Sequence, residues 1–403
     1  MATRICSYLL LVALIVGAGC ATLPRTIDED TLEQDIEARA EQWQGDTGRI
    51  ISTMANRMAA KAASLGDPVA TVDIDILVLS GGGEYGAFGA GFLNGWGARN
   101  DGILPRPDFD IVTGISTGAL IAPFAFLGDE TSYATVLNLY KEATPEFAVL
   151  RGLFFFLPRN PAFLDNSGLV NTVRETVDES LLQRVSEAYA ENRLLFIGTT
   201  DIDVGQFVVW DLGHETVAHP DPEERFEQIL LASSAIPAAF PPVFIDNHLH
   251  VDGGATEQMF IATDYRIMEA AVNEARQCGL QDHPVNFRFW IVVNGQLALD
   301  AEVVPPSWFK IAQRSLTMLM KASSLSALQR GQQMTEILNA RQNDITGEFR
   351  YVCIPQNFDL PQSRNLFNPD LMQRLTELGF EMGADPSVWR TEAPRFGRGV
   401  LVE

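Results

Sequence analysis

Ser116 is the residue whose type and neighbours most directly indicate chemistry in this chain. It lies in the run Gly-Ile-Ser-Thr-Gly, residues 114–118, which follows an apolar strand-like segment and precedes an apolar stretch, residues 119–127, typical of a buried helix. Gly114 and Gly118 allow a sharp turn from strand to helix, because neither carries a Cβ atom that could obstruct it. The serine hydroxyl then lies at a helix N-terminus, where developing negative charge is favoured. The run therefore predicts a nucleophile for acyl transfer.

A serine nucleophile needs a base, and Asp252 is the predicted one. The chain has five histidines, and none stands in a recognisable motif for a nucleophile's partner. Asp252 ends a short strand-like run, and Gly253 and Gly254 after it allow another segment to approach closely. Asp-Gly-Gly is equally typical of an ordinary turn. A Ser-His-Asp triad is the alternative, with His283 as the best-placed histidine.

A glycine-rich loop, residues 80–86, follows the apolar run 74–79 and precedes a segment that can start a helix. Its glycines are Gly81, Gly82, Gly83 and Gly86. Such a turn exposes successive backbone N–H groups that, with the helix dipole, can stabilise an anion, either a phosphate or an oxyanion. A dinucleotide site would also need a ribose-binding acid at the end of the next strand. Asp108 and Asp110 are poorly placed for that role.

Together, the glycine-rich loop, the serine run and the Asp-Gly-Gly run resemble, in order and spacing, the three motif blocks of the patatin-like phospholipases. The resemblance covers about residues 74–255. It is strengthened by residues 232–242, Ala-Ser-Ser-Ala-Ile-Pro-Ala-Ala-Phe-Pro-Pro, which are similar to the family's segment ahead of its catalytic aspartate. This combination is far more specific than any one of the motifs.

The resemblance implies an α/β fold of three layers, α/β/α, around a mostly parallel central sheet. It implies a Ser-Asp dyad without histidine, metal or cofactor, which acts on acyl esters of phospholipids, galactolipids or neutral lipids. By position, Ser116 attacks the ester carbonyl and Asp252 accepts its proton. Backbone N–H groups around Gly82 and Gly83 stabilise the oxyanion, a contact worth about 3 kcal/mol per donor. One departure is Tyr85, where the family commonly has Arg or Lys.

The remaining sequence predicts the elements that position these residues. From residue 73 onward, apolar runs bounded by glycine alternate with longer amphipathic segments, which is typical of a mostly parallel sheet with helices on both faces. The predicted strands are residues 74–79, 109–113, 194–199, 207–211 and 287–293. The predicted helices are residues 86–99, 117–127, 222–232, 263–277, 307–343 in one or two pieces, and 369–378.

The pattern divides the chain into four regions. They are a lipoprotein signal peptide at 1–19, an acidic helical spacer at 20–70, a patatin-like catalytic domain at 71–300, and a mainly helical C-terminal extension packed on the core at 301–403. A partly disordered tether is the alternative for the spacer. Residues 150–164, which include a run of three phenylalanines, are too apolar for an exposed loop. They are predicted to be core rather than an acyl-contacting surface.

The N-terminus predicts a lipid anchor. Residues 5–16 form an apolar run that is too short to span a bilayer but suits a signal peptide. Residues 17–20, Gly-Ala-Gly-Cys, resemble the lipobox of bacterial lipoproteins, although Gly17 stands where leucine is usual. Lipidation of Cys20 would tether the chain at the periplasmic side of the cell envelope. Ala21 lacks the acid associated with inner-membrane retention, which favours the outer membrane.

Two further cysteines, Cys278 and Cys353, belong to the folded part of the chain and have no metal-ligand spacing. One disulfide and two buried free thiols are both compatible with the sequence, because pairing geometry cannot be read from it.

The charge of the chain limits its partners. Its 29 basic and 52 acidic side chains give a formal net charge of -23, which repels phosphate backbones and argues against nucleic acid. The same charge argues against electrostatic adhesion to anionic lipid, so membrane residence needs an anchor or an apolar surface. The predicted function is a serine acyl-ester hydrolase of phospholipase A or lysophospholipase type. The alternatives are a non-catalytic lipid-binding envelope protein, a Ser-His-Asp esterase and an acyltransferase.

Overall fold

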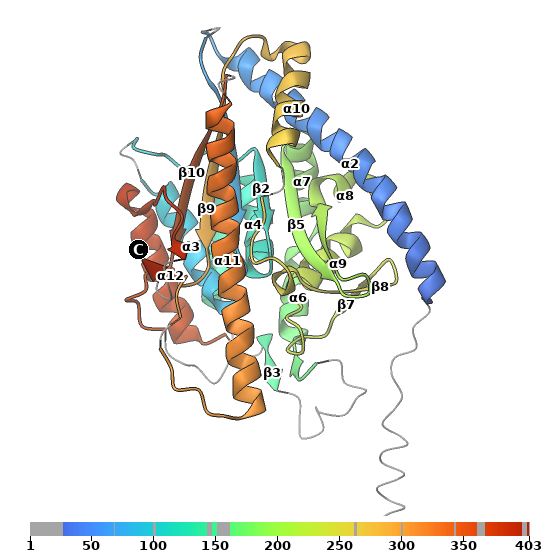
Figure 1. The fold of residues 1–403 in the computed structure, drawn as a ribbon, viewed down its shortest axis with the longest axis vertical. Coiled ribbons are helices and arrows are strands. Elements are labelled where there is room, and N and C mark those ends of the chain that lie inside the picture. The colour runs from blue at the N-terminus through green and yellow to red at the C-terminus, as the bar shows by residue number, and fades with distance from the viewer. Residues whose placement is uncertain are drawn as a thin grey trace, which may run out of the picture.

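A mostly parallel sheet of eight strands runs through the centre of the molecule (Figure 1). The computed structural model describes residues 27–67, 69–99, 102–142, 147–150, 162–261, 264–299, 301–341, 344–360, 367–396 and 401–402. The spatial order of the strands is β10 (Ile345–Cys353), β9 (Val285–Val293), β1 (Val72–Leu79), β2 (Ile111–Gly114), β5 (Leu194–Asp201), β8 (His248–Asp252) and β7 (Val243–Ile245), while β6 (Gln206–Asp211) also pairs with β5. The first five are parallel to one another, and β6, β7 and β8 pair antiparallel.

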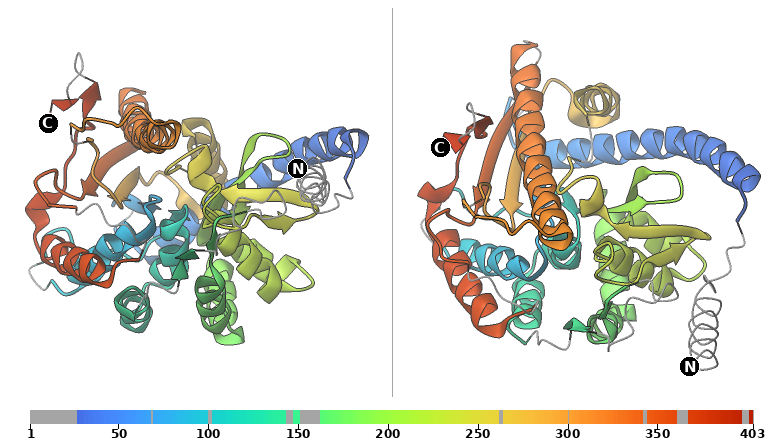
Figure 2. Two further views of the ribbon diagram at one scale, coloured as in Figure 1. Left: turned by 90° about the horizontal axis from the view of Figure 1, so that it is seen from below. Right: turned by 60° about the horizontal axis from the view of Figure 1, so that its bottom comes forward.

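Helices cover both faces of this sheet, which confirms the predicted three-layer α/β class (Figures 1 and 2). Along β1, Leu77 and Leu79 enter one core while Ile76 and Val78 enter the other, because successive strand residues point to opposite faces. The first core contains α3 (Gly86–Gly97), α4 (Thr117–Leu127), α5 (Glu130–Glu142), α6 (Ser167–Thr176), α7 (Glu179–Ala190), α9 (Pro222–Ser233) and α12 (Pro369–Gly383). The second contains α2 (Glu29–Ser64), α10 (Tyr265–Ala275) and α11 (Trp308–Ala340).

Shorter elements complete the described chain. They are α8 (Leu212–Ala218), the hairpins of β3 (Val149–Leu150) with β4 (Leu164–Asp165) and β11 (Arg395–Phe396) with β12 (Leu401–Val402), and the short helices η1 (Gly83–Tyr85), η3 (Gly253–Ala255), η4 (Arg276–Leu280) and η5 (Pro386–Val388). All five predicted strands are present, with small shifts of their ends. The predicted helix at 307–343 is one continuous helix, α11. Among the described residues, no helix combines the length and apolarity that a membrane span requires.

The second half of helix α2, which lies in the region predicted to be a spacer, packs on the folded domain. It begins after Asp28, whose side chain caps the helix by accepting from Thr31 N–H at 2.9 Å. Its second half is buried under the sheet through Ile50, Met54 and Met58. Each such side chain contributes about 1.5–3 kcal/mol when fully buried. The helix therefore forms part of the second core rather than holding the domain away from a surface.

Ion pairs also hold α2 against the sheet. Asp110, which is buried, accepts hydrogen bonds from Arg57 Nε and Lys61 Nζ, both at 2.7 Å, and from the Asp75 N–H at 2.8 Å. A buried carboxylate needs partners of this kind, because its desolvation would otherwise be uncompensated. The two cations of α2 thus neutralise a charge at the start of β2.

The region 301–403 is built into the same domain. It contributes β10, which pairs with β9 over nine residues, and α12, which lies against α3 (Figure 1). The two helices approach closely at glycines: a Cβ atom on Gly91 would overlap the carbonyl oxygen of Thr376, and one on Gly379 would overlap that of Phe88. The region is mainly helical and packed on the core, but it also completes an edge of the sheet.

Several predicted features fall outside the described residues. These are the signal peptide, Cys20 and the phenylalanines at 154–156. At the described end of the apolar segment 150–164, Ala162 and Leu164 are buried. Cys278 is exposed and Cys353 is buried, and the two do not form a disulfide, so only one of the two thiols is buried as the second alternative expected.

We expect Arg57→Met to lower the free energy of unfolding by about 2 kcal/mol, because it leaves the buried Asp110 with fewer compensating charges. Arg184→Met is the matched control, since Arg184 pairs with Asp129 at the surface, and it should change stability by less than about 1 kcal/mol. Urea unfolding followed by circular dichroism measures both. Equal effects would mean that the ion pairs do not hold α2 in place.

Candidate active site

The carboxyl ends of β2 and β8 meet head-on at one edge of β5. β2 pairs with residues 194–197 of β5 and β8 pairs with residues 199–201. Both lie on the same edge, because β6 occupies the opposite edge alongside both segments. β2 is parallel and β8 antiparallel to β5, so the two strands run toward each other. Ser116, just after β2, and Asp252, the last residue of β8, are thereby brought together.

Ser116 occupies a strained turn between β2 and α4. Its backbone has φ 55° and ψ -123°, in the left-handed range that non-glycine residues rarely adopt and that costs about 1–3 kcal/mol. The turn depends on the flanking glycines. A Cβ atom on Gly114 would lie 2.5 Å from the carbonyl oxygen of Gly118, and one on Gly118 would overlap the carbonyl oxygens of Leu79 and Ser80. This is the physical reason for the spacing of the serine run.

Ser233 holds this turn in place. Its Oγ accepts a hydrogen bond from the Ser116 N–H at 3.0 Å and donates to the carbonyl oxygen of Gly198 at 2.7 Å. The side chain is buried at the C-terminal end of α9. It thus satisfies a buried N–H of the strained turn and ties that turn to β5.

Asp252 is a buried carboxyl beside Ser116, whose side chain helps to lower its pKa. Its Oδ1 also accepts from the N–H of Gly254 at 2.7 Å, and its own N–H donates to Ala235 O at 2.9 Å. Burial raises the pKa of Asp252 from 3.8 to about 7, although the hydrogen bonds from Ser116 and Gly254 lower it. A carboxyl with this pKa can exchange a proton near neutral pH.

Gly253 and Gly254 allow Asp252 to approach the serine. A Cβ atom on Gly253 would lie 2.5 Å from the carbonyl oxygen of Gly198, and one on Gly254 would lie 2.5 Å from Gln258 Nε2. The Asp-Gly-Gly run is therefore both a turn, η3, and the place where β8 ends against β5.

The glycine-rich loop lies beside the serine. A Cβ atom on Gly81 would come within 3.4 Å of Ser116 Cβ, and the Gly81 N–H donates to Gln258 O at 2.9 Å. Gly82 packs so closely on Asn294 that a side chain could not be added, and Gly83 has φ 57°. Among the described residues, the N–H groups of Gly82 and Gly83 have no protein acceptor. They are therefore available to an anion at this turn.

The other loop residues have packing roles. A Cβ atom on Gly86 would overlap Thr117 Oγ1, so this glycine lets α3 pass close to α4. Glu84 is buried, and its Oε2 accepts from the N–H of Asn368 at 2.7 Å, which fixes the start of α12. Tyr85 is partly buried against the first core. The loop thus offers backbone donors and no basic side chain.

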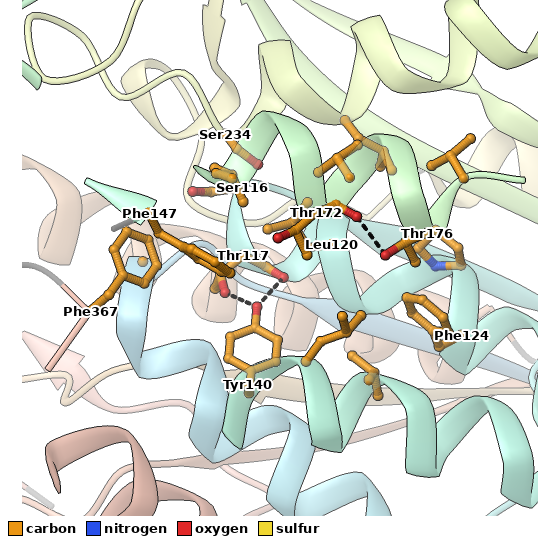
Figure 3. Close-up of a pocket in the computed structure, with 18 of the residues that line it drawn as sticks. Ser116, Thr117, Leu120, Phe124, Tyr140, Phe147, Thr172, Thr176, Ser234 and Phe367 are labelled. Atoms are coloured by element: carbon orange, nitrogen blue, oxygen red, sulfur yellow. Dashed lines mark hydrogen bonds between the residues drawn. The ribbon is translucent and has the colours of Figure 1, made fainter. Parts of the chain in front are cut away.

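An apolar cavity of about 80 Å³ opens beside Ser116 (Figure 3). It extends from Ser116 and Ser234 at one end to Phe124 and Thr176 at the other. Helices α4, α5, α6 and α9 supply most of the wall, which includes Leu120, Leu139, Val173, Leu230 and Phe240. The hydroxyl of Ser234 is buried and has no hydrogen-bond partner among the described residues. This shape and polarity suit a hydrocarbon chain attached to a polar group.

The alternative base, His283, is far from this centre in the fold. It precedes β9, and its Nδ1 lies 2.8 Å from the carbonyl oxygen of Ala70, at the ends where β1 and β9 begin. Ser116 lies where β2 ends, at the opposite end of these parallel strands. A triad through His283 is therefore incompatible with the fold.

One group of side chains among the described residues has metal-ligand geometry. Asp201, Asp203 and His248 place three ligand atoms within 4.8 Å of one another. Asp201, however, forms an ion pair with Arg39 and contacts His248 Nδ1 at 2.8 Å. Burial lowers the pKa of the neighbouring His250 to about 4, so His250 is neutral at pH 7. Arg39 already compensates the charge of Asp201, and the group spans the β5–β6 turn and the first residue of β8.

Three supporting residues were not assigned roles from the sequence: Ser233, Gln258 and Asn294. Gln258 bridges the motifs, because its carbonyl accepts from Gly81 and its Nε2 donates to Gly254 O at 2.9 Å. Asn294 Nδ2 donates to Ser80 O at 2.8 Å. Of the three, only Ser233 lies in a run, Ala-Ser-Ser, that the sequence singled out. Gln258 and Asn294 lie after the motifs, in segments without a recognisable pattern.

A known protein family matches the part of the chain that holds this site. Residues 77–263 match the family described as patatin-like phospholipase, which confirms the resemblance of the three motifs. No curated protein sequence matches the chain. Among solved structures, the chain is similar to VipD from Legionella pneumophila at 12% identity and a TM-score of 0.38, over 80% of this chain and 68% of that one.

We expect Asp252→Asn to stabilise the fold by roughly 3 kcal/mol more at pH 8 than at pH 4.5. The pKa of Asp252 is about 7 in the folded protein and 3.8 in the absence of burial. The protonated carboxyl therefore contributes fully to the stability of the fold below about pH 3.8, and this contribution is lost as the pH rises through about 7. The asparagine cannot ionise and avoids that loss. Urea unfolding at the two pH values measures it, and an equal gain at both would contradict a raised pKa.

Proposed function

We propose that Ser116 and Asp252 are the catalytic dyad of a lipid acyl hydrolase, on the premise that residues 77–263 match the patatin-like phospholipase family, whose members are lipid acyl hydrolases. The observation that carries the proposal is that the ends of β2 and β8 bring Ser116 beside Asp252, a buried carboxyl whose pKa is raised to about 7. In its ionised form Asp252 accepts the hydroxyl proton as Ser116 Oγ attacks the ester carbonyl. The alcohol leaves with that proton, and water then releases the acyl group by the same route.

The glycine-rich loop would stabilise the negative charge that develops on the carbonyl oxygen. The N–H groups of Gly82 and Gly83 are fixed in advance by the packing of Gly82 on Asn294 and by the Gly81 contact to Gln258. Donors that need no reorganisation contribute about 3 kcal/mol each to such a transition state. Tyr85 provides no positive charge, so the backbone donors carry this role.

The cavity supports a substrate with an aliphatic acyl chain. Its wall is almost entirely apolar, and it begins at Ser116, so a bound chain would place its ester next to the nucleophile. The hydroxyl of Ser234, at the same end, would contact an ester oxygen. A phospholipid or lysophospholipid fits these features. An acyltransferase would use the same acyl-enzyme, with an alcohol in place of water.

We further propose that the chain is a bacterial envelope lipoprotein. Cys20, at the end of the lipobox-like run, would carry the lipid, and the domain would lie on the periplasmic side, with the outer membrane favoured by Ala21. No nucleic-acid partner is expected from the net charge of -23. Radiolabelled palmitate incorporation that depends on Cys20 tests this proposal.

The main rival is a protein that keeps the fold and binds lipid without turnover. The strained backbone of Ser116 speaks against it, because about 1–3 kcal/mol of strain is retained most readily where chemistry needs it. The buried carboxyl of Asp252 also speaks against a non-catalytic protein, because a carboxyl buried without an ion pair destabilises the fold.

We expect Ser116→Ala and Asp252→Asn each to reduce hydrolysis of a medium-chain p-nitrophenyl ester and of a labelled phospholipid by about a thousandfold or more. Ser132→Ala and Asp203→Asn are matched controls outside the cavity and should stay within about twofold of the parent. A fluorophosphonate probe should label the parent and not Ser116→Ala. Turnover without Ser116, or a folded parent that neither hydrolyses nor reacts with the probe, would contradict the proposal.

We expect kcat/KM on the soluble ester to rise with pH through a single ionisation near pH 7 and to level off above it. Asp252 must be ionised to accept the proton, and burial places its pKa at about 7. Initial rates between pH 5 and pH 9 measure this. A profile that is flat from pH 5 to pH 7 would mean that Asp252 is not the base.

A further inference from the structure

The first half of α11 projects from the domain with apolar side chains in solvent. None of its described residues from Trp308 to Met320 is buried, whereas Leu325, Leu328 and Leu338 of the second half are in the second core. Trp308 is 82% exposed and Leu319 67% exposed. Six large apolar residues form this surface, which we call the α11 face: Val303, Trp308, Ile311, Leu316, Met318 and Leu319. Exposed large apolar side chains gathered on one segment are typical of an interaction site.

The same segment has a local charge opposite to that of the chain. Residues 303–335 contain four basic side chains and no acidic one, in a protein whose formal net charge is -23. Lys310, Arg314 and Lys321 lie on neighbouring positions of the helix surface. Arg314 pairs with Glu302 at 3.2 Å and Lys321 Nζ donates to Ala298 O at 2.8 Å. The Nζ of Lys310 donates to the neutral side chain of Gln313 at 3.2 Å.

The α11 face lies at the catalytic end of the molecule. α11 is joined to β10 by a short connection and runs antiparallel to it, so its first half reaches past the ends of the strands (Figures 1 and 2). Where the exposed half ends, Ser323 Oγ accepts from the Gln258 N–H at 3.0 Å. Gln258 in turn contacts Gly81 and Gly254 beside the dyad. The helix therefore has one packed end and one free end at the rim of the site.

We propose that the first half of α11 is an interfacial helix that docks the catalytic end of the protein on an anionic lipid surface. A helix with exposed Trp, Ile, Leu and Met beside basic residues and no acid inserts its apolar side into the headgroup region, while the basic residues face anionic lipid. The choice of lipid as occupant rests on the proposed function, because an acyl ester must leave the bilayer to reach Ser116. Because α11 lies beside the site, docking through α11 would bring Ser116 close to the membrane that the ester leaves.

A second copy of this chain is the rival occupant of the α11 face. The rest of the protein is strongly acidic, so two copies brought together repel each other through most of their surface. The basic residues of α11 would interact with the charges of an anionic partner, whereas an apolar interface between two copies of the chain would not require them. Charge thus favours a lipid surface over self-association.

The test is binding of the full chain to phosphatidylcholine vesicles with and without phosphatidylglycerol. Cys20→Ser and Ser116→Ala are present throughout, so that neither a lipid on the cysteine nor hydrolysis affects the result. Ile311→Asp with Leu319→Asp should weaken binding by about tenfold or more, while Val217→Asp, an equally exposed apolar position on α8, should not. Lys310→Glu should remove the preference for phosphatidylglycerol, while Lys141→Glu on α5 should not.

Two results would overturn the proposal. One is that the parent does not bind vesicles, or binds as well after the double aspartate change. The other is that the double change converts a dimer to a monomer in sedimentation while vesicle binding is unaltered, which would assign the face to a second copy.

Activity separates this proposal from the proposed function. With Ser116 intact, the double aspartate variant should hydrolyse the soluble ester within about twofold of the parent but lose about tenfold or more on vesicle phospholipid. Loss on the soluble ester as well would mean that α11 acts on the site itself and not by docking. A parent that binds vesicles through α11 but cleaves no ester would refute the dyad and leave the docking surface standing.

Discussion

The meeting of β2 and β8 at Gly198 of β5 is the constraint on which the candidate active site depends. Gly198 lies between the residues of β5 that pair with β2 and those that pair with β8. Its carbonyl oxygen accepts from Ser233, which holds the Ser116 turn, and it lies against Gly253, which follows Asp252. A side chain on Gly198 itself would overlap the ring of Phe207. The serine and the aspartate are thus placed by contacts to one residue, although they come from distant parts of the chain.

This centre is destabilising, and the rest of the fold has to compensate for it. It contains a serine in a left-handed conformation and a carboxyl that is buried without an ion pair. The buried Asp110 presents the opposite solution, because Arg57 and Lys61 of α2 neutralise it. The buried carboxylate of Asp110 is paired, whereas the buried carboxyl of Asp252 has no ion pair among the described residues. The two apolar cores on either side of the sheet hold the unfavourable geometry in place.

Local patterns predicted the parts of this arrangement that are local. The turn at Ser116 follows from glycines two residues away on each side, and β1 follows from an apolar run. The position of α2 could not be predicted, because its acidic first half conceals that Met54 and Met58 pack on a sheet formed later in the chain. β10 was also missed, since its register depends on β9 rather than on its own alternation. Gln258 and Asn294 support the loop through contacts that no sequence spacing encodes.

The net charge of the whole chain and the charge of residues 303–335 predict different behaviour at an anionic membrane. The overall charge disfavours anionic lipid, yet the charge of residues 303–335 is positive, and a helix that projects from the domain is affected mainly by charges within about a Debye length. Helices α2 and α11 both end shortly before a parallel strand begins, at Val72 and Ile345. Both therefore start toward the carboxyl ends of the sheet, where Ser116 lies. A lipid on Cys20, shortly before α2, and insertion of α11 would act at the same end of the domain, and two weak attachments together hold a protein on a membrane far better than either one alone.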